Sequence, residues 1–215
     1  VIDLDPQGNA TTGLGHSNVD GSEKSIYNAL NGSKNISEVI KKTEINDLDI
    51  ITSNVDLSGL EVETAGDNGR AFILRDKLSI FFKENSSNYS HIFIDCPPSL
   101  SLLTVMALVA SNSLIVPLQT EFFALEGLTQ LVKTIDRVKE SLNSDLSIRG
   151  IILTMYDKRN KLSGQVEKEA RDYFKDKVYN TVIPRNVRLS EAPSHGIPVL
   201  IYDKTCPGSK SYFNL

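Results

Sequence analysis

Two aspartates stand one residue apart at the start of the chain, in the segment V-I-D-L-D-P-Q-G-N. Asp3 and Asp5 end an apolar run that is typical of a buried strand, and alternate side chains of a strand point to the same side. Open α/β sheets place their ligands at the carboxyl ends of strands, and Pro6 and Gly8 then turn the chain sharply. The pattern favours two carboxylates facing one phosphate and metal site over ordinary capping of a loop.

A further carboxylate closes another apolar run, in the segment H-I-F-I-D-C-P-P-S-L of residues 91–100. An apolar strand that ends in an aspartate, here Asp95, has the Walker B layout, in which the carboxylate holds the magnesium ion of a bound nucleotide. Pro97 and Pro98 give this strand a rigid exit because proline restricts the backbone. We interpret Cys96 as a small buried residue rather than a ligand or a nucleophile.

Polar side chains also follow the apolar run that ends at Pro184, in the segment T-V-I-P-R-N-V-R-L-S-E-A-P-S-H-G-I-P-V of residues 181–199. Arg185, Asn186 and Arg188 come directly after this strand. This is again the position at which an α/β sheet binds its ligand.

Three other kinds of site are not indicated. His16, His91 and His195 are far apart, without H-x-x-x-H spacing and without a cysteine pair, so a zinc site is not expected. The G-L-G segment at 13–15 follows a loop and lacks the third glycine of the dinucleotide fingerprint. The sequence also lacks the G-x-S-x-G motif of hydrolases.

The elements that must position these residues alternate between apolar runs and amphipathic segments. Nearly continuous apolar runs are typical of strands covered on both faces, and their alternation with helices predicts an α/β protein with a mostly parallel sheet and helices on both faces. Residues 16–47 are polar with only short helical stretches expected, 53–70 is predicted to be a loop, and the whole of 1–215 is expected to form a single domain. Strands are predicted at 1–4, 48–52, 91–94, 114–118, 148–153 and 178–183, and helices at 69–83, 101–110, 125–142, 163–175 and from 209 onward.

Composition restricts the class of protein. The 215 residues are 40% hydrophobic and 23% charged, as in soluble globular chains, and no apolar run reaches the roughly 18–20 residues that span a bilayer. Two cysteines cannot form a disulfide framework, which favours a reducing cytoplasm. Val1 is not a methionine and the first strand is already under way, so we expect an internal piece of a longer protein, truncated at both ends and missing its first βα unit.

Charge is unevenly distributed along the chain. Residues 149–188 hold ten Lys or Arg against five Asp or Glu, although the net charge of the whole chain is −4. By itself this excess is typical of a solvated helix surface. It also leaves a local basic face in an acidic protein.

Taken together and in order, these segments resemble the ParA/Soj family of chromosome- and plasmid-partitioning ATPases, in the MinD/ParA branch of P-loop proteins. The resemblance covers essentially the whole chain. It rests on D-L-D-P-Q-G-N-A-T-T-G-L-G, I-D-C-P-P-S-L, E-F-F-A-L-E-G-L-T-Q-L at 121–131, L-T-M-Y-D at 153–157 and I-P-R-N-V-R-L-S-E-A-P-S-H-G. It implies a P-loop NTPase-like fold. The family's deviant Walker A loop, K-G-G-x-G-K-T, lies one helix upstream of the D-L-D-P-Q strand and is not in this sequence. We therefore expect ATP hydrolysis by the full-length parent and none by these 215 residues alone.

The resemblance also implies roles for the carboxylates. Asp5 matches the residue that orients or activates the attacking water, which makes it the expected catalytic residue. Asp3 and Asp95 match the groups around magnesium, so ATP and Mg²⁺ are the expected cofactors.

Other matched positions bear on the nucleotide base and on DNA. The loop from Pro184 through Arg185 to Asn186, together with Met155, matches the region near the adenine. Arg159 and Arg188 match positions of DNA contact, and both lie in the basic stretch, which changes our interpretation of that stretch to a DNA-binding face. Phosphate contacts by Lys and Arg are independent of DNA sequence.

The resemblance finally implies a cycle. ATP closes a homodimer, the dimer binds double-stranded DNA without sequence preference, and a ParB-type partner stimulates hydrolysis. The expected location is the cytoplasm, in association with the nucleoid and not with a membrane. The alternatives are a MinD-like or cargo-positioning ATPase of the same branch, or a non-catalytic fragment that binds DNA or a partner. The motif at 184–196 favours the ParA side over MinD.

Overall fold

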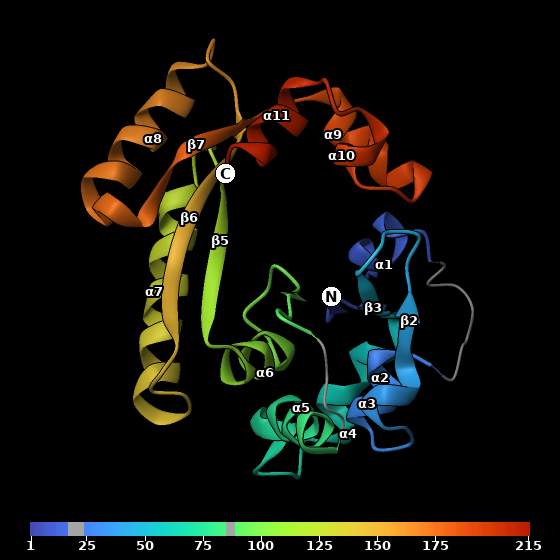
Figure 1. Ribbon diagram of the computed structural model, residues 1–215. Helices are drawn as coiled ribbons and strands as arrows, with labels where there is room; N and C mark the ends of the chain where they lie inside the picture. The colour runs from blue at the N-terminus through green and yellow to red at the C-terminus, as the bar shows by residue number, and fades with distance from the viewer. Residues whose placement is uncertain (17–23, 85–88) are drawn as a thin grey trace. The chain divides into compact units, whose positions relative to one another are not determined.

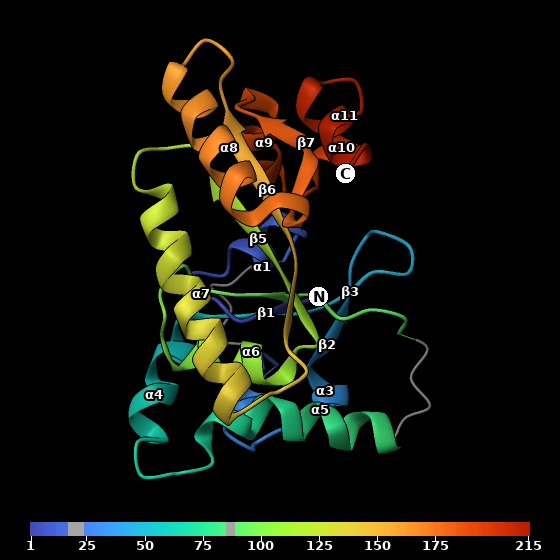
Figure 2. The same ribbon diagram turned by 90° about the vertical axis from the view of Figure 1, so that its left-hand side faces the viewer.

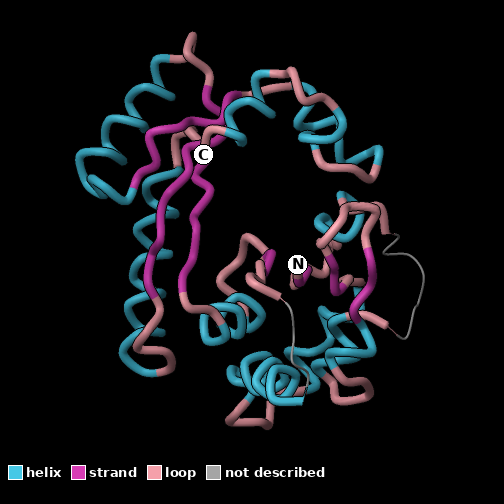
Figure 3. Tube along the Cα trace, viewed as in Figure 1, coloured by secondary structure: helices cyan, strands magenta, loops and turns pink. Residues whose placement is uncertain are grey.

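A computed structural model describes residues 1–16, 24–84 and 89–215, and these form two compact units (Figure 1). The first unit contains residues 1–111 and 193–197, and the second contains residues 112–192 and 198–215. Each unit has its own sheet with helices around it (Figure 3). The predicted α/β class and the mostly parallel pairing are confirmed, with the described strands divided between two sheets.

The sheet of the first unit has the order β2-β3-β1-β4. Strand β1 pairs in parallel with β3 and with β4, whereas β2 pairs antiparallel to β3 at the edge. The three parallel strands lie where the sequence predicts them, and β2 is an addition in a polar segment for which only helical stretches are predicted. The bounds are β1 Ile2–Asp3, β2 Ile40–Lys42, β3 Asp49–Ile51 and β4 Ile94–Asp95.

The helices of the first unit bury their apolar sides against this sheet. The core includes Ile2 and Leu4 of the β1 segment, Leu74 of α5 and Met106 of α6. The predicted loop at 53–70 is partly wrong, because Leu57 and Leu60 are fully buried and their turns are helical. Its α-helices are α1 Asn9–Gly13, α2 Ile26–Leu30, α3 Ile36–Val39, α4 Leu60–Glu63, α5 Ile73–Glu84 and α6 Leu102–Ala110, and its 3₁₀ helices are η1 Val55–Gly59 and η2 Arg70–Phe72.

The sheet of the second unit is entirely parallel, in the order β5-β6-β7. Helices α7 and α8 lie in front of this sheet in Figure 2, and α11 packs beside β7. Leu128 of α7 and Ala170 of α8 pack with Ile151 and Leu153 of β6 in one core. The bounds are β5 Ser113–Gln119, β6 Ser147–Tyr156, β7 Val178–Pro184, α7 Ala124–Ser141, α8 Lys161–Phe174, η3 Lys175–Lys177, α9 Val187–Glu191, α10 Val199–Tyr202 and α11 Pro207–Phe213, while η4 Ala192–His195 falls across both units.

Candidate functional site

Neighbouring parallel strands bring the three predicted carboxylates together at the carboxyl ends of β1 and β4. Asp3 pairs in register with Asp95, and Asp5 follows β1 by two residues. Asp3 is fully buried, Asp5 is 7% exposed, and Asp95 is the most exposed of the three. All three groups belong to the first unit. The sheet therefore brings Asp95 beside Asp3 and Asp5, from which it is distant in the sequence.

The buried carboxylate of Asp3 is held by hydrogen bonds to both of its oxygens. Oδ2 accepts hydrogen bonds from the backbone N–H and from the hydroxyl of Thr11, each at 2.7 Å. Oδ1 accepts a hydrogen bond from the backbone N–H of Asp5 at 3.1 Å. Burial raises the pKa of Asp3, and the bonds from Thr11 and Asp5 oppose that shift.

A tight turn fixes Asp5. Its Oδ1 accepts a hydrogen bond from the Gln7 N–H at 3.0 Å, and its carbonyl oxygen accepts one from the Gly8 N–H at 2.9 Å. Gly8 has a φ of 66°, in the left-handed region that glycine adopts without a steric cost, and it stands at the N-cap of α1. The predicted turn after Asp5 is confirmed, with Pro6 and Gln7 at its centre.

The electrostatics of the cluster favour a cation. The pKa of Asp95 is raised, first by partial removal of its carboxyl group from water and then by the charges of Asp3 and Asp5. Burial and the same neighbouring charges raise the pKa of the Cys96 thiol to about 12, so this side chain stays protonated at neutral pH. A protonated thiol is a poor nucleophile and metal ligand, which agrees with the prediction that Cys96 is neither, although its side chain is only partly buried and not fully buried as predicted.

The donor set suits magnesium in the presence of a phosphate ligand. Among residues 1–16, 24–84 and 89–215, no group of three or more His, Cys, Asp or Glu side chains is arranged to hold a metal ion. Mg²⁺ takes one or two protein carboxylates and completes its shell with water and substrate phosphates. The partly exposed Asp95 fits that requirement better than the buried Asp3 does.

The residues predicted near a nucleotide base lie in the second unit, at the carboxyl ends of β6 and β7. The Arg185 N–H donates a hydrogen bond to the Tyr156 carbonyl oxygen at 3.0 Å, which joins the two strand ends. Met155 just before this point has a φ of 53°, a left-handed conformation that is uncommon for a residue with a long side chain. Asn186 caps α9 by accepting a hydrogen bond from the Arg188 N–H.

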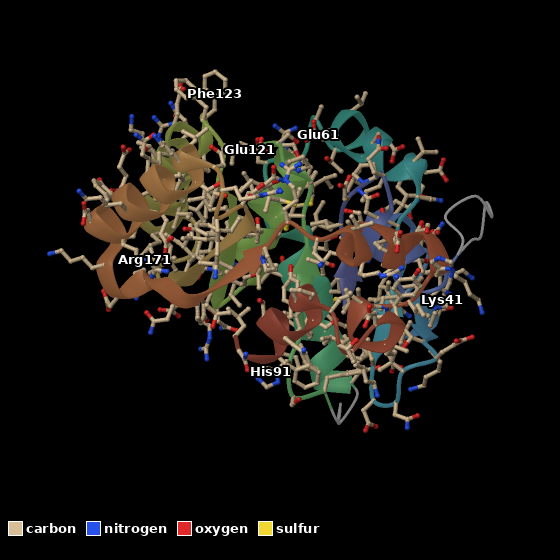
Figure 4. All side chains as sticks on the ribbon, turned by 90° about the horizontal axis from the view of Figure 1, so that it is seen from above. Lys41, Glu61, His91, Glu121, Phe123 and Arg171 are labelled. Atoms are coloured by element: carbon tan, nitrogen blue, oxygen red, sulfur yellow. The ribbon has the colours of Figure 1, made fainter. Side chains whose placement is uncertain are left out.

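Two cavities open beside these strand ends, and Arg185 and Asp157 line both. The first has a volume of about 420 Å³ and includes Met155 and the Arg185–Glu121 ion pair, in which Nη2 and Oε1 are 3.2 Å apart. Glu121 lies on the connection between β5 and α7 and is labelled in Figure 4. The second cavity has a volume of about 550 Å³ and includes Pro184. The structure thus brings Met155, Pro184 and Arg185 to the rims of adjacent hollows, whereas Asn186 lines neither.

Both arginines predicted to contact DNA carry exposed ion pairs within the second unit. The Arg159 guanidinium forms two bonds to the Asp157 carboxylate, at 3.0 and 2.9 Å, and lowers the pKa of Asp157 to about 2. Arg188 contacts Glu191 at 2.8 Å and Asp203 at 3.6 Å. Exposed pairs of this kind contribute little to stability and exchange readily with other anions.

Thr11 ties α1 to the carboxylate cluster and is not among the site residues predicted from the sequence. Thr11 is fully buried, whereas Thr12 beside it is exposed. The T-T pair carries no signal that separates the two residues. Only the register of the short helix against β1 does so.

Comparison with known proteins gives close relatives along the full chain. A family model described as an AAA domain matches residues 1–148. The chromosome partitioning protein ParA of Caulobacter vibrioides is 51% identical over 215 residues, which are 100% of this chain and 79% of that protein. The sporulation initiation inhibitor protein Soj of Bacillus subtilis is 47% identical over 100% of this chain and 83% of its own length.

Solved structures give the same fold. Cobyrinic acid a,c-diamide synthase from Mycobacterium smegmatis, with a bound ATP analogue and magnesium, has a TM-score of 0.83 and 30% identity over 99% of this chain and 78% of that one. A plasmid partition protein from Borrelia burgdorferi bound to AMPPNP has a TM-score of 0.79 and 24% identity over 99% of this chain and 82% of that one, which bears on the fold alone. In the part of the chain that the structure describes, no helix has the length and apolarity needed to cross a membrane.

Proposed function

Because the chain belongs to the ParA/Soj family of partitioning ATPases, we propose that the full-length protein hydrolyses ATP to drive chromosome or plasmid partitioning. The observation that carries this proposal is the register of β1 against β4, which sets the D-L-D-P-Q segment beside the Walker B aspartate. Both units are proposed to belong to one ATPase domain spanning 1–215.

The carboxylates have separate roles in this proposal. Asp5 orients or activates the water that attacks the terminal phosphate, and its fixed turn supports that role by limiting the directions in which its side chain can point. Asp95 would be the carboxylate nearer a bound magnesium ion, and Asp3 would contribute its negative charge from the buried side of the cluster. Magnesium, when bound, neutralises charge on the transferred phosphoryl group.

The base of the nucleotide is proposed to lie at the carboxyl ends of β6 and β7, among Met155, Pro184, Arg185 and Asn186. The two cavities beside these strand ends support this placement, since Arg185 lines both of them. Arg185 already pairs with Glu121 across an exposed surface, so it can reorient toward a ligand at little cost.

The binding partners follow from the same proposal. The ATP-bound homodimer binds double-stranded DNA without sequence preference through Arg159 and Arg188, and a ParB-type protein stimulates hydrolysis. The exposure of both arginines within a basic stretch supports this role. The protein then acts in the cytoplasm in association with the nucleoid.

The test is phosphate release by the purified full-length protein, measured with and without Mg²⁺, with random-sequence DNA, and with a ParB-type protein. The expected result is slow hydrolysis that requires Mg²⁺ and rises when DNA and the partner are both present. Hydrolysis that is indifferent to Mg²⁺, or an ATP-bound protein that ignores DNA, would contradict the proposal.

A further inference from the structure

The Thr11 side chain links three segments of the first unit through one hydroxyl group. The hydroxyl donates a hydrogen bond to Asp3 Oδ2 at 2.7 Å and accepts one from the Ser53 backbone N–H at 2.9 Å. Thr11 belongs to α1, Asp3 ends β1, and Ser53 follows β3. The Thr11 backbone N–H adds a second bond to the same Asp3 oxygen at 2.7 Å.

Burial makes this junction stiff. Thr11 and Asp3 have no exposed surface, and Ser53 is 1% exposed. Hydrogen bonds to an ionised carboxylate are shorter and stronger than bonds between neutral groups. Loss of the Thr11 hydroxyl would remove one of the two bonds from Thr11 to Asp3 Oδ2 and would take the acceptor from the buried Ser53 N–H, with no bulk water to replace it. The orientation of the Asp3 carboxylate therefore depends directly on Thr11.

The other oxygen of Asp3 restrains the backbone of Asp5. Asp3 Oδ1 accepts a hydrogen bond from the Asp5 N–H at 3.1 Å, which fixes the peptide that carries the Asp5 side chain. The Gln7 N–H then holds the Asp5 carboxylate at 3.0 Å. A continuous chain of hydrogen bonds runs from the Thr11 hydroxyl through Asp3 to Asp5.

We propose that Thr11 is a positioning residue for ATP hydrolysis. Its hydrogen bonds hold the carboxylate of Asp3, and Asp3 in turn orients Asp5. This inference rests on the proposed role of Asp5 in hydrolysis. It assigns Asp3 an indirect action through the Asp5 peptide, since both Asp3 oxygens already accept bonds within the protein. Thr11 itself does not contact the nucleotide, so its loss changes the rate of the reaction and not the binding of ATP or Mg²⁺.

The test compares three variants of the full-length protein. Thr11→Val keeps the shape of the side chain and removes the hydroxyl, Thr11→Ser restores the hydroxyl, and Thr12→Val makes the same change at the exposed neighbour. Single-turnover hydrolysis is measured at saturating ATP, together with the ATP dissociation constant and the Mg²⁺ concentration that gives half the maximal rate.

Thr11→Val is expected to slow hydrolysis about tenfold or more, because small displacements of a catalytic group have large effects on rate. Its ATP affinity and Mg²⁺ requirement should stay within about twofold of wild type. Thr11→Ser and Thr12→Val should hydrolyse ATP at nearly the wild-type rate. A normal rate in Thr11→Val, an equally slow Thr11→Ser, or a raised Mg²⁺ requirement in Thr11→Val would overturn the inference.

A second measurement distinguishes loss of positioning from general destabilisation, in case Thr11→Val is less stable than wild type. Hydrogen exchange of the Asp5 amide is compared with that of the Leu4 amide, which donates to the Asp95 carbonyl oxygen at 2.8 Å and not to Asp3. Loss of the Thr11 hydroxyl should accelerate exchange at Asp5 more than at Leu4, in Thr11→Val and also in Thr11→Ala. Equal acceleration at both amides would show general destabilisation and would contradict a positioning role.

Asp5→Ala is measured alongside, and it separates this inference from the proposed function. If Asp5→Ala abolishes hydrolysis while Thr11→Val does not slow it, only the positioning role fails. If Asp5→Ala hydrolyses ATP normally, the catalytic role of Asp5 fails and the positioning role falls with it.

Discussion

Asp3 and Asp95 face each other in the register of two parallel strands, yet one carboxylate is fully buried and the other is partly exposed. The buried group accepts hydrogen bonds from Thr11 and Asp5, whereas the exposed group is available to solvent and its pKa is raised in part by the charges of Asp3 and Asp5. Asp3 therefore holds neighbouring groups of the site in place, and Asp95 is the better placed of the two to bind a cation.

Asp5→Asn in the full-length protein should slow single-turnover hydrolysis by about 100-fold or more, which is the usual range for loss of a positioned acid–base group. ATP binding and ATP-dependent dimerisation should persist, because other groups hold the phosphates. Phosphate release and size-exclusion chromatography measure the two effects. Asp136→Asn, at an exposed position on α7, is the matched control and should behave as wild type. Equal turnover in the two variants would remove Asp5 from the reaction.

Asp95→Asn should stabilise the nucleotide-free protein and weaken its response to magnesium. The charge at Asp95 is disfavoured by Asp3 and Asp5, so a neutral amide relieves repulsion in the absence of a cation. Urea unfolding without nucleotide should show a higher midpoint than wild type. The Mg²⁺ concentration needed for half-maximal hydrolysis should rise several-fold. A lower midpoint with an unchanged Mg²⁺ requirement would assign Asp95 a purely structural role.

Arg159→Ala and Arg188→Ala should each weaken binding to unrelated DNA sequences by similar factors. Each lost phosphate contact should lower the slope of log affinity against log salt by about one unit. Fluorescence anisotropy over a salt series measures both quantities. Arg137→Ala removes the same charge from the exposed side of α7 and should leave the slope unchanged. A loss confined to one DNA sequence would indicate base contacts instead.

Asp157→Asn should tighten DNA binding by roughly two- to fivefold, because it releases the guanidinium of Arg159 from an exposed ion pair. The pKa of Asp157 is lowered to about 2, so this carboxylate competes with DNA phosphates at every pH at which the assay is run. Asp172→Asn makes the same change in net charge on the exposed side of α8. A similar gain in both variants would mean that net charge, and not the release of Arg159, is responsible.

Gly150→Ala should lower the free energy of unfolding by about 1–3 kcal/mol, since overpacking a filled site forces side chains to move. Gly150 is buried in β6, and an added Cβ would overlap the ring of Tyr179. Gly127→Ala on α7 is the control, because an added Cβ there meets nothing within 4 Å. That variant should be more stable than wild type by roughly 0.5–1 kcal/mol, as expected for alanine in a helix. Urea unfolding of both variants measures the two changes in the free energy of unfolding, which should have opposite signs.

The sequence predicts the parallel strands well because each is an apolar run with a helix after it. It does not predict β2 or α4, because their few residues are too short to show a period. The edge strand β2 is held by its antiparallel pairing with β3, and α4 is held by the burial of Leu60. The three aspartates are visible as strand ends, whereas Thr11 is not, since its burial depends on how α1 packs against β1. Local pattern identifies groups that do chemistry, and tertiary packing selects those that hold them in place.

The wholly parallel sheet of the second unit has a consequence for how this unit folds. Strands β5, β6 and β7 are each separated by a helix along the chain, so none of their ladders closes through a hairpin. Each pairing must close a long loop before its hydrogen bonds compensate for the lost chain entropy, and a topology dominated by such contacts folds slowly. The central strand β6 stays unpaired on one side until β7 has been synthesised, and its apolar residues Ile151 to Leu153 are then open to other chains. Chaperone binding to the second unit is therefore expected while the ribosome translates α8.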